Sequence, residues 1–140
     1  MIAYLDASAI MRIILDEPGD PAPHRTAESL VSSCVAEVET FRTLDRVRFA
    51  GRVTDVEAAR KNSELTHLLR DLHLLPVSPL IIALARGTFP VPVGALDALH
   101  VASAQWLREE TGEDLEFWTH DRRQATAALC RALDVRGVEV

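Results

Sequence analysis

The chain has 140 residues, of which 48% are hydrophobic, and this length and apolar content suit one domain with its own core. Its formal net charge of −6 excludes a protein that grips nucleic acid through overall basicity, because such binding neutralises many phosphates. No apolar run approaches the roughly 20 residues that span a bilayer, and a signal-peptide pattern is absent, so we expect a cytoplasmic protein with a single domain over 1–140.

Short apolar segments alternate with amphipathic ones along the chain. The apolar segments lack the strict alternation of a half-solvated strand, which is typical of strands buried on both faces. We expect strands at 2–5, 30–33, 73–77, 115–119 and 136–140. Helical patterns occupy 8–15, 24–29, 35–50, 54–71, 79–86, 95–110 and 121–133. The alternation predicts an α/β fold, with a mainly parallel central sheet of four to five strands flanked by about seven helices.

Local signals refine this assignment. Thr54 followed by Glu57 is typical of a capping box that opens a helix, and Gly112 stands where a glycine commonly ends one. Proline and glycine predict loops at 16–23 and 87–94.

Four carboxylates fall where such a sheet would bring them together. Asp6 directly follows the first strand, and Asp121 follows the strand at 115–119. Glu39 lies early in one predicted helix, and Asp97 opens another. Loops and helix N-termini converge at the carboxyl ends of parallel strands, so these four acids are expected to share one edge of the sheet.

Each acid also has a purely structural explanation. Asp97 and Asp121 suit helix N-termini, where aspartate caps free N–H groups, and Asp6 suits a turn. Glu39 has Glu37 two residues away, and either could be a surface glutamate. The combination favours a functional site, because crowded carboxylates repel one another unless a cation holds them. An all-oxygen ligand set favours Mg²⁺ or Mn²⁺ over zinc.

Four segments together resemble the PIN-domain family of metal-dependent nucleases, and more closely the VapC toxins of bacterial toxin–antitoxin pairs. "YLDASAI" resembles the family's opening strand with Asp then Ser, and "SSCVAEVETFR" resembles its strand end leading into a helix with one acid. "LDALHVASA" is similar to the family's most diagnostic segment, and "FWTHDRR" to its closing strand with Thr-x-Asp. All four occur in the family's order and spacing.

The resemblance implies that the catalytic and metal-binding residues are Asp6, Glu39, Asp97 and Asp121. It also implies that Ser8 and Thr119 hydrogen-bond the acids or a metal-bound water. We align Glu39 rather than Glu37 with the family acid, because Glu39 precedes Phe41-Arg42 as the family's glutamate precedes its apolar-arginine segment. For His100, three residues after Asp97, a buried packing role is favoured over a ligand role.

By the same resemblance the protein is expected to be a Mg²⁺- or Mn²⁺-dependent endoribonuclease, the toxin of a type II pair, that cleaves RNA phosphodiesters through metal-activated water. Its implied partners are RNA, a VapB-type antitoxin and a second copy in a homodimer, whose interface could include Ile81, Ile82 and Leu84. Arginines near the acids could bind RNA locally despite the negative total charge, with Arg42, Arg46 and Arg122 as candidates.

Two alternatives remain open at this point. One is a catalytically silent PIN-like module that binds RNA or antitoxin, although all four acids are present. The other is a different Mg²⁺-dependent phosphoryl-transfer protein. That alternative is weaker, because such proteins have a second acid next to the first aspartate or two residues after it, and a lysine from a strand late in the chain. Here Asp6 is followed by Ala7 and Ser8, and Lys61 lies in the middle of a predicted helix.

Overall fold

A five-stranded parallel sheet forms the centre of the computed structural model, which describes residues 1–17 and 27–140. Its strands are β1 (Ile2–Leu5), β2 (Ser29–Ser33), β3 (His73–Leu75), β4 (Leu115–Trp118) and β5 (Asp134–Arg136). They lie in the order β3-β2-β1-β4-β5, and all four pairings are parallel. The central position of β1 explains why its four residues are all buried.

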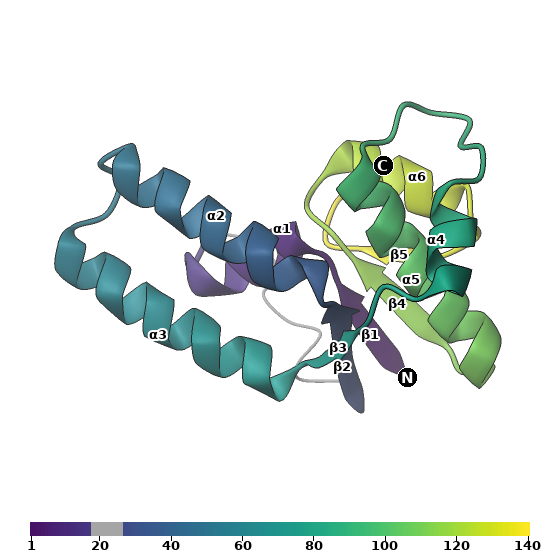
Figure 1. The fold of residues 1–140 in the computed structure, drawn as a ribbon, viewed down its shortest axis with the longest axis horizontal. Coiled ribbons are helices and arrows are strands. Elements are labelled where there is room, and N and C mark those ends of the chain that lie inside the picture. The colour runs from purple at the N-terminus through teal and green to yellow at the C-terminus, as the bar shows by residue number, and fades with distance from the viewer. Residues whose placement is uncertain (18–26) are drawn as a thin grey trace.

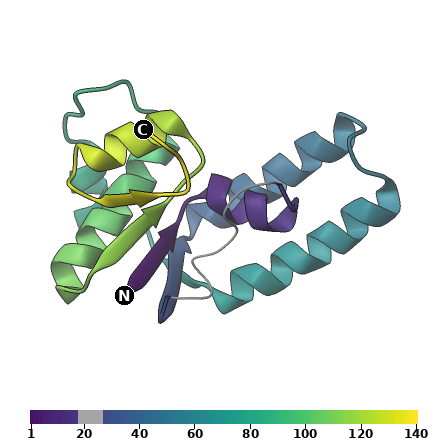
Figure 2. The same ribbon diagram turned by 180° about the vertical axis from the view of Figure 1, so that it is seen from behind.

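Six helices in the described residues cover the sheet (Figures 1 and 2): α1 (Ala7–Ile14), α2 (Val35–Phe49), α3 (Asp55–Asp71), α4 (Pro79–Ala85), α5 (Ala95–Thr111) and α6 (Arg122–Leu129). In both views α2 and α3 form a long hairpin that projects beyond the sheet, while α4, α5 and α6 gather beside β4 and β5. None of the helices in the described part of the chain is long and apolar enough to cross a membrane.

The two faces of β1 contribute to two separate hydrophobic clusters. Ala3 and Leu5 pack with residues of α1, α2 and α3. Ile2 and Tyr4 point to the other face and pack with residues of α5 and α6. The α/β fold class and the parallel sheet predicted from the sequence are confirmed.

The local signals in the sequence are also confirmed. Thr54 caps α3, its hydroxyl oxygen accepting a hydrogen bond from the Glu57 N–H at 3.1 Å. Gly112 ends α5 in the left-handed conformation with φ +66°. The segment between α4 and α5 is a loop, as its proline content predicted.

Two predicted elements are wrong in position. The predicted helix 24–29 lies partly outside the described residues, and its described part is not helical: residues 27 and 28 are irregular, and Ser29 begins β2. Most of the predicted loop 16–23 also lies outside the described residues. Backbone pairing overrides the helical pattern there, because the Glu28 N–H donates to the Met1 carbonyl at 3.1 Å. The helix predicted at 121–133 ends at Leu129. The described residues therefore hold six helices, not seven.

The last strand runs over 134–136 instead of 136–140, and Gly137 explains why it stops. Gly137 has φ +93°, and a Cβ there would lie 2.7 Å from the Thr119 carbonyl oxygen and 3.0 Å from the His120 ring. Only glycine fits this close approach without displacing neighbours. The end of β5 is thereby held against the end of β4.

We predict that Gly137→Ala destabilises the protein by more than the roughly 1–2 kcal/mol that a left-handed backbone costs an alanine, because its Cβ also collides with the Thr119 backbone. Urea unfolding measures the loss. Gly51→Ala is the control, since Gly51 also has positive φ but nothing within 4 Å of its missing Cβ. Equal losses in the two variants would show that the close approach at Gly137 contributes nothing.

Candidate active site

A cleft of about 1090 Å³ opens at the carboxyl edge of the sheet, between α1, α2 and the first turns of α5 and α6. Glu39, Asp97 and Asp121 line it. Asp6 lies just beneath, fully buried, and contacts Ser8 and Gln124, which do line the cleft. The structure thus brings together the four acids that the sequence analysis singled out.

Asp6 is held by the start of its own helix. Its Oδ1 accepts the Ala9 N–H at 2.8 Å, which caps α1, and the Ser8 hydroxyl at 2.6 Å. Burial raises the pKa of Asp6, although the neighbouring His100 and the hydroxyl of Ser8 act in the opposite direction. The predicted contact between Ser8 and an acid is present.

Thr119 joins the site through Ser8 and the backbone. Its Oγ1 lies 3.3 Å from the Ser8 Oγ and accepts the Asp121 N–H at 3.1 Å. Ser8 Oγ in turn accepts the His120 N–H at 2.9 Å. The two hydroxyls therefore connect the end of β1 to the end of β4 and fix where Asp121 begins α6.

Glu39 is positioned by two buried side chains, His100 of α5 and Tyr4 of β1. His100 is fully buried, with Nε2 2.6 Å from Glu39 Oε1 and Nδ1 2.9 Å from the Tyr4 hydroxyl. Burial raises the pKa of Tyr4, so its hydroxyl keeps its proton beside the imidazole. Both ring nitrogens of His100 are therefore engaged, one by the Glu39 carboxyl and the other by the Tyr4 hydroxyl. Glu37, in contrast, is exposed and does not line the cleft.

This arrangement corrects the sequence interpretation of His100. The residue is buried, as expected, but its ring does more than pack, since both nitrogens are engaged and one orients Glu39. Sequence reasoning missed Tyr4 altogether. A tyrosine inside an otherwise aliphatic strand is the signal that could have found it, because a buried hydroxyl needs a hydrogen-bond partner.

Asp97 and Asp121 stand at the N-terminal ends of α5 and α6. Asp97 is in the first turn of α5 and is partly buried, and its pKa is raised by this burial and by the neighbouring carboxylate of Asp121. Asp121 is exposed and caps α6, with Oδ1 accepting the Arg123 N–H at 2.8 Å and the Gln124 N–H at 3.3 Å. The capping interpretation therefore holds for Asp121 together with its place at the cleft.

Gln124 is a site residue that sequence reasoning did not find. It is 3% exposed, and with its nitrogen facing the acids its amide donates to Asp6 Oδ2 at 2.6 Å and to Asp97 Oδ1 at 3.3 Å. The signal available in the sequence was a polar residue among alanines on the buried face of a short helix, with Ala125, Ala127 and Ala128 beside it.

The donor set at this edge suits a hard divalent ion, since it consists of carboxylate oxygens with one amide and two hydroxyls nearby. The raised pKa values of Asp6 and Asp97 are the expected result of burying carboxylates with too little positive charge beside them. As the side chains stand in the described residues, no three His, Cys, Asp or Glu groups converge as an ion would require. The Gln124 amide lies between Asp6 and Asp97.

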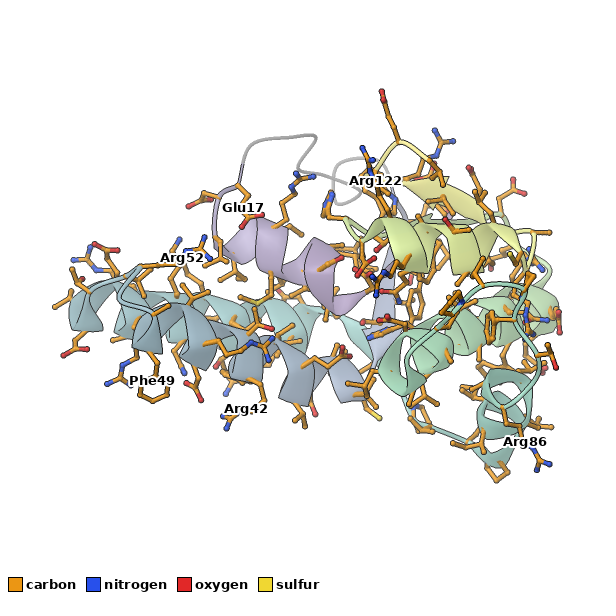
Figure 3. The ribbon with its side chains drawn as sticks, turned by 90° about the horizontal axis from the view of Figure 1, so that it is seen from above. Glu17, Arg42, Phe49, Arg52, Arg86 and Arg122 are labelled. Atoms are coloured by element: carbon orange, nitrogen blue, oxygen red, sulfur yellow. The ribbon has the colours of Figure 1, made fainter. Side chains whose placement is uncertain are left out.

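Arginines surround the acids along the cleft. Those that line it are Arg12, Arg42, Arg46, Arg52 and Arg122, which include the three arginines predicted to bind RNA. In Figure 3, Arg42 extends from α2 and Arg122 from the start of α6, whereas Arg86 lies away from them at the end of α4. Arg12, which was not predicted, contacts the His120 ring from α1.

Comparison with known proteins agrees with this architecture. The family model described as "PIN domain" matches residues 3–129. Ribonuclease VapC46 of Mycobacterium tuberculosis is 35% identical over 128 residues, covering 89% of this chain and 88% of the relative. Ribonuclease VapC47 of the same species is 29% identical over 127 residues, covering 86% and 85%.

Solved structures share the fold. PAE2754 from Pyrobaculum aerophilum superposes with a TM-score of 0.59 at 20% identity, covering 91% of this chain and 87% of the other. VapBC-1 from nontypeable Haemophilus influenzae superposes with a TM-score of 0.51 at 18% identity, covering 97% of each. With its fold, its acidic cleft and these matches, the chain belongs to the PIN-domain family. Within that family it is a VapC-type member.

Burial of Asp6 predicts a pH dependence of stability. The folded-state pKa of Asp6 is raised above the ordinary aspartate pKa of about 3.9. At pH values between these two pKa values, the native protein holds a proton that the unfolded chain has already released. The stability contributed by Asp6 is thus complete below that range and is lost as the pH rises through it.

Asparagine at this position does not titrate. We therefore expect the free energy of unfolding of Asp6→Asn, relative to that of wild type, to increase as the pH rises through this range. Urea unfolding from pH 4 to 7.5 in EDTA measures the difference. Asp114→Asn, at an exposed position, serves as control. A difference between Asp6→Asn and wild type that does not change with pH would contradict the raised pKa.

Proposed function

We propose that this protein is a divalent-metal-dependent endoribonuclease and the toxin of a type II toxin–antitoxin pair. The observation that supports this best is the cleft at the carboxyl edge of the sheet, which is lined by Glu39, Asp97, Asp121 and five arginines, with Asp6 buried just beneath it. The names of the two M. tuberculosis relatives, both ribonucleases, agree with it.

The proposed division of labour follows from the geometry. Asp6, Glu39, Asp97 and Asp121 would hold Mg²⁺ or Mn²⁺. When bound, the ion supplies Lewis-acid chemistry at the phosphodiester and promotes ionisation of water.

The chain's own groups hold the acids in place for that purpose. Ser8 and the Ala9 amide fix Asp6, and the Tyr4–His100 pair fixes Glu39. Fixed groups of this kind lower the reorganisation that the reaction requires.

The arginines of the cleft suit an RNA substrate. Arg42 and Arg46 of α2 are exposed and line the cleft. Arg46 donates to the Thr43 hydroxyl at 2.9 Å, and Arg42 pairs with Asp45 at 2.8 Å. A phosphate chain laid along this surface would meet positive charge locally, although the whole protein is negative. Unpaired RNA is the favoured form because its bases are accessible.

Two protein partners belong to the same proposal. A VapB-type antitoxin would silence the enzyme by presenting an arginine or a helix to the acids. The name of the superposed VapBC-1 structure agrees with a partner of this kind. A second copy would dock through α4. Of the residues suggested for that interface, Ile81 is buried at 1% exposure, while Ile82 is 45% exposed and its neighbour Leu80 is 64% exposed.

Cleavage of a panel of structured RNAs tests the nuclease directly. We expect discrete products with Mg²⁺ or Mn²⁺ and none in EDTA, and a loss of at least about 100-fold in Asp97→Asn and Glu39→Gln. Glu37→Gln is the matched control, since it changes an exposed glutamate one half-turn away on α2 and should cleave normally. A folded wild type that binds RNA without cutting it would support a catalytically silent binding module instead.

RNA binding tests the arginine lining. In the Asp97→Asn background, Arg46→Ala or Arg122→Ala should weaken binding of single-stranded RNA and reduce the slope of log K against log[salt] by about 0.7 for each phosphate that the variant no longer neutralises. Fluorescence anisotropy at several salt concentrations measures both quantities. Arg86→Ala, which removes the same charge outside the cleft, should change neither, and an equal effect there would assign binding to general charge.

A further inference from the structure

Gln124 is a buried amide whose side chain is aimed at the acids. It lies in the first turn of α6 and is 3% exposed, while the other side of the turn presents exposed arginines to solvent. A glutamine so deeply buried needs partners for its polar atoms. The groups that it meets belong to two different parts of the chain, Asp6 at the end of β1 and Asp97 in α5.

The chemistry of these partners favours the orientation in which the amide nitrogen faces the acids. Its nitrogen lies 2.6 Å from Asp6 Oδ2 and 3.3 Å from Asp97 Oδ1 when it is oriented to donate. The opposite orientation would set the amide oxygen against carboxylate oxygens, which only accept when ionised. The NH₂ group carries two hydrogens, one for each carboxylate, so it bridges the two acids.

We propose that Gln124 is a positioning residue that stands between Asp6 and Asp97 in the metal-free protein, in the place that the divalent ion takes over when it binds. This inference rests on the proposed metal-dependent function. Two carboxylates this close repel each other, and the shared donor lowers that repulsion and keeps them aligned. Metal binding releases the amide from both acids, so Gln124 stabilises the metal-free state more than the metal-bound state.

A consequence follows for the affinity of the ion. Any interaction present only in the metal-free protein must be broken before the ion binds, and it therefore weakens metal binding. Gln124 would hold the site together without metal at the cost of some affinity. A simple ligand role for its amide oxygen has the opposite signature, because removing a ligand weakens binding.

Gln124→Met tests the proposal, since methionine keeps the length and volume of the side chain and removes the amide. We expect a lower Tm than wild type in EDTA, a much smaller Tm difference at saturating Mn²⁺, and Mn²⁺ binding by calorimetry that is about 3- to 10-fold tighter. Gln105→Met is the matched control, because Gln105 lies outside the cleft and contacts Glu109 and Arg131. It should leave Mn²⁺ affinity unchanged.

A second measurement uses the wild-type protein, in case the variant does not fold. The chain has three side-chain amides, Asn62, Gln105 and Gln124, so their NH₂ signals are readily assigned in a ¹⁵N spectrum. Titration with Mg²⁺ should move the Gln124 pair and speed its hydrogen exchange as the bridge opens, while the other two pairs stay in place.

The outcomes separate this proposal from the proposed function. Weaker Mn²⁺ binding in Gln124→Met would make the residue a ligand, and equal Tm losses with and without Mn²⁺ at unchanged affinity would make its role packing alone. Either result overturns the proposal and leaves the proposed metal-dependent nuclease unaffected. The same holds if the Gln124 amide signals do not change on titration with Mg²⁺. Wild type that binds neither ion overturns both.

Discussion

The burial of one carboxylate, that of Asp6, is the constraint on which the rest of the structure depends. The residue follows the central strand of the sheet, where neighbouring strands on both sides exclude solvent, and its side chain is fully buried. The N-terminus of α1 offers it an N–H group and the positive end of a helix dipole. Ser8 and Gln124 supply further hydrogen bonds. The central strand of the sheet therefore ends just beneath the cleft.

Much of this could be predicted, because it depends on short-range patterns. An apolar segment followed by aspartate places Asp6 at a strand end, and the same pattern places Asp121. In a parallel sheet those ends share an edge whatever the order of the strands. The acids of α2 and α5 needed the family resemblance as well, since a helix alone does not reveal which face looks toward the sheet. The contact with His100 distinguishes Glu39 from Glu37.

The remainder depends on contacts between residues far apart in the chain. Tyr4 and His100 are 96 positions apart, and no local pattern connects them. Gln124 is marked by no motif, and its role depends on where Asp97 arrives from another helix. The end of β5 could not be placed either, because Gly137 is required by a carbonyl on the neighbouring strand segment and not by its own neighbours in sequence.

The hydrogen-bonded path from Tyr4 to Glu39 connects the hydrophobic core to the wall of the cleft. Tyr4 stacks on Phe117, with ring centroids 5.5 Å apart, among residues whose only evident task is packing. Cores usually tolerate exchanges between large apolar side chains of similar volume. At this position that tolerance ends, because a phenylalanine would fill the same space and leave a buried imidazole nitrogen unpaired. A search confined to surface residues would not find this support of the cleft.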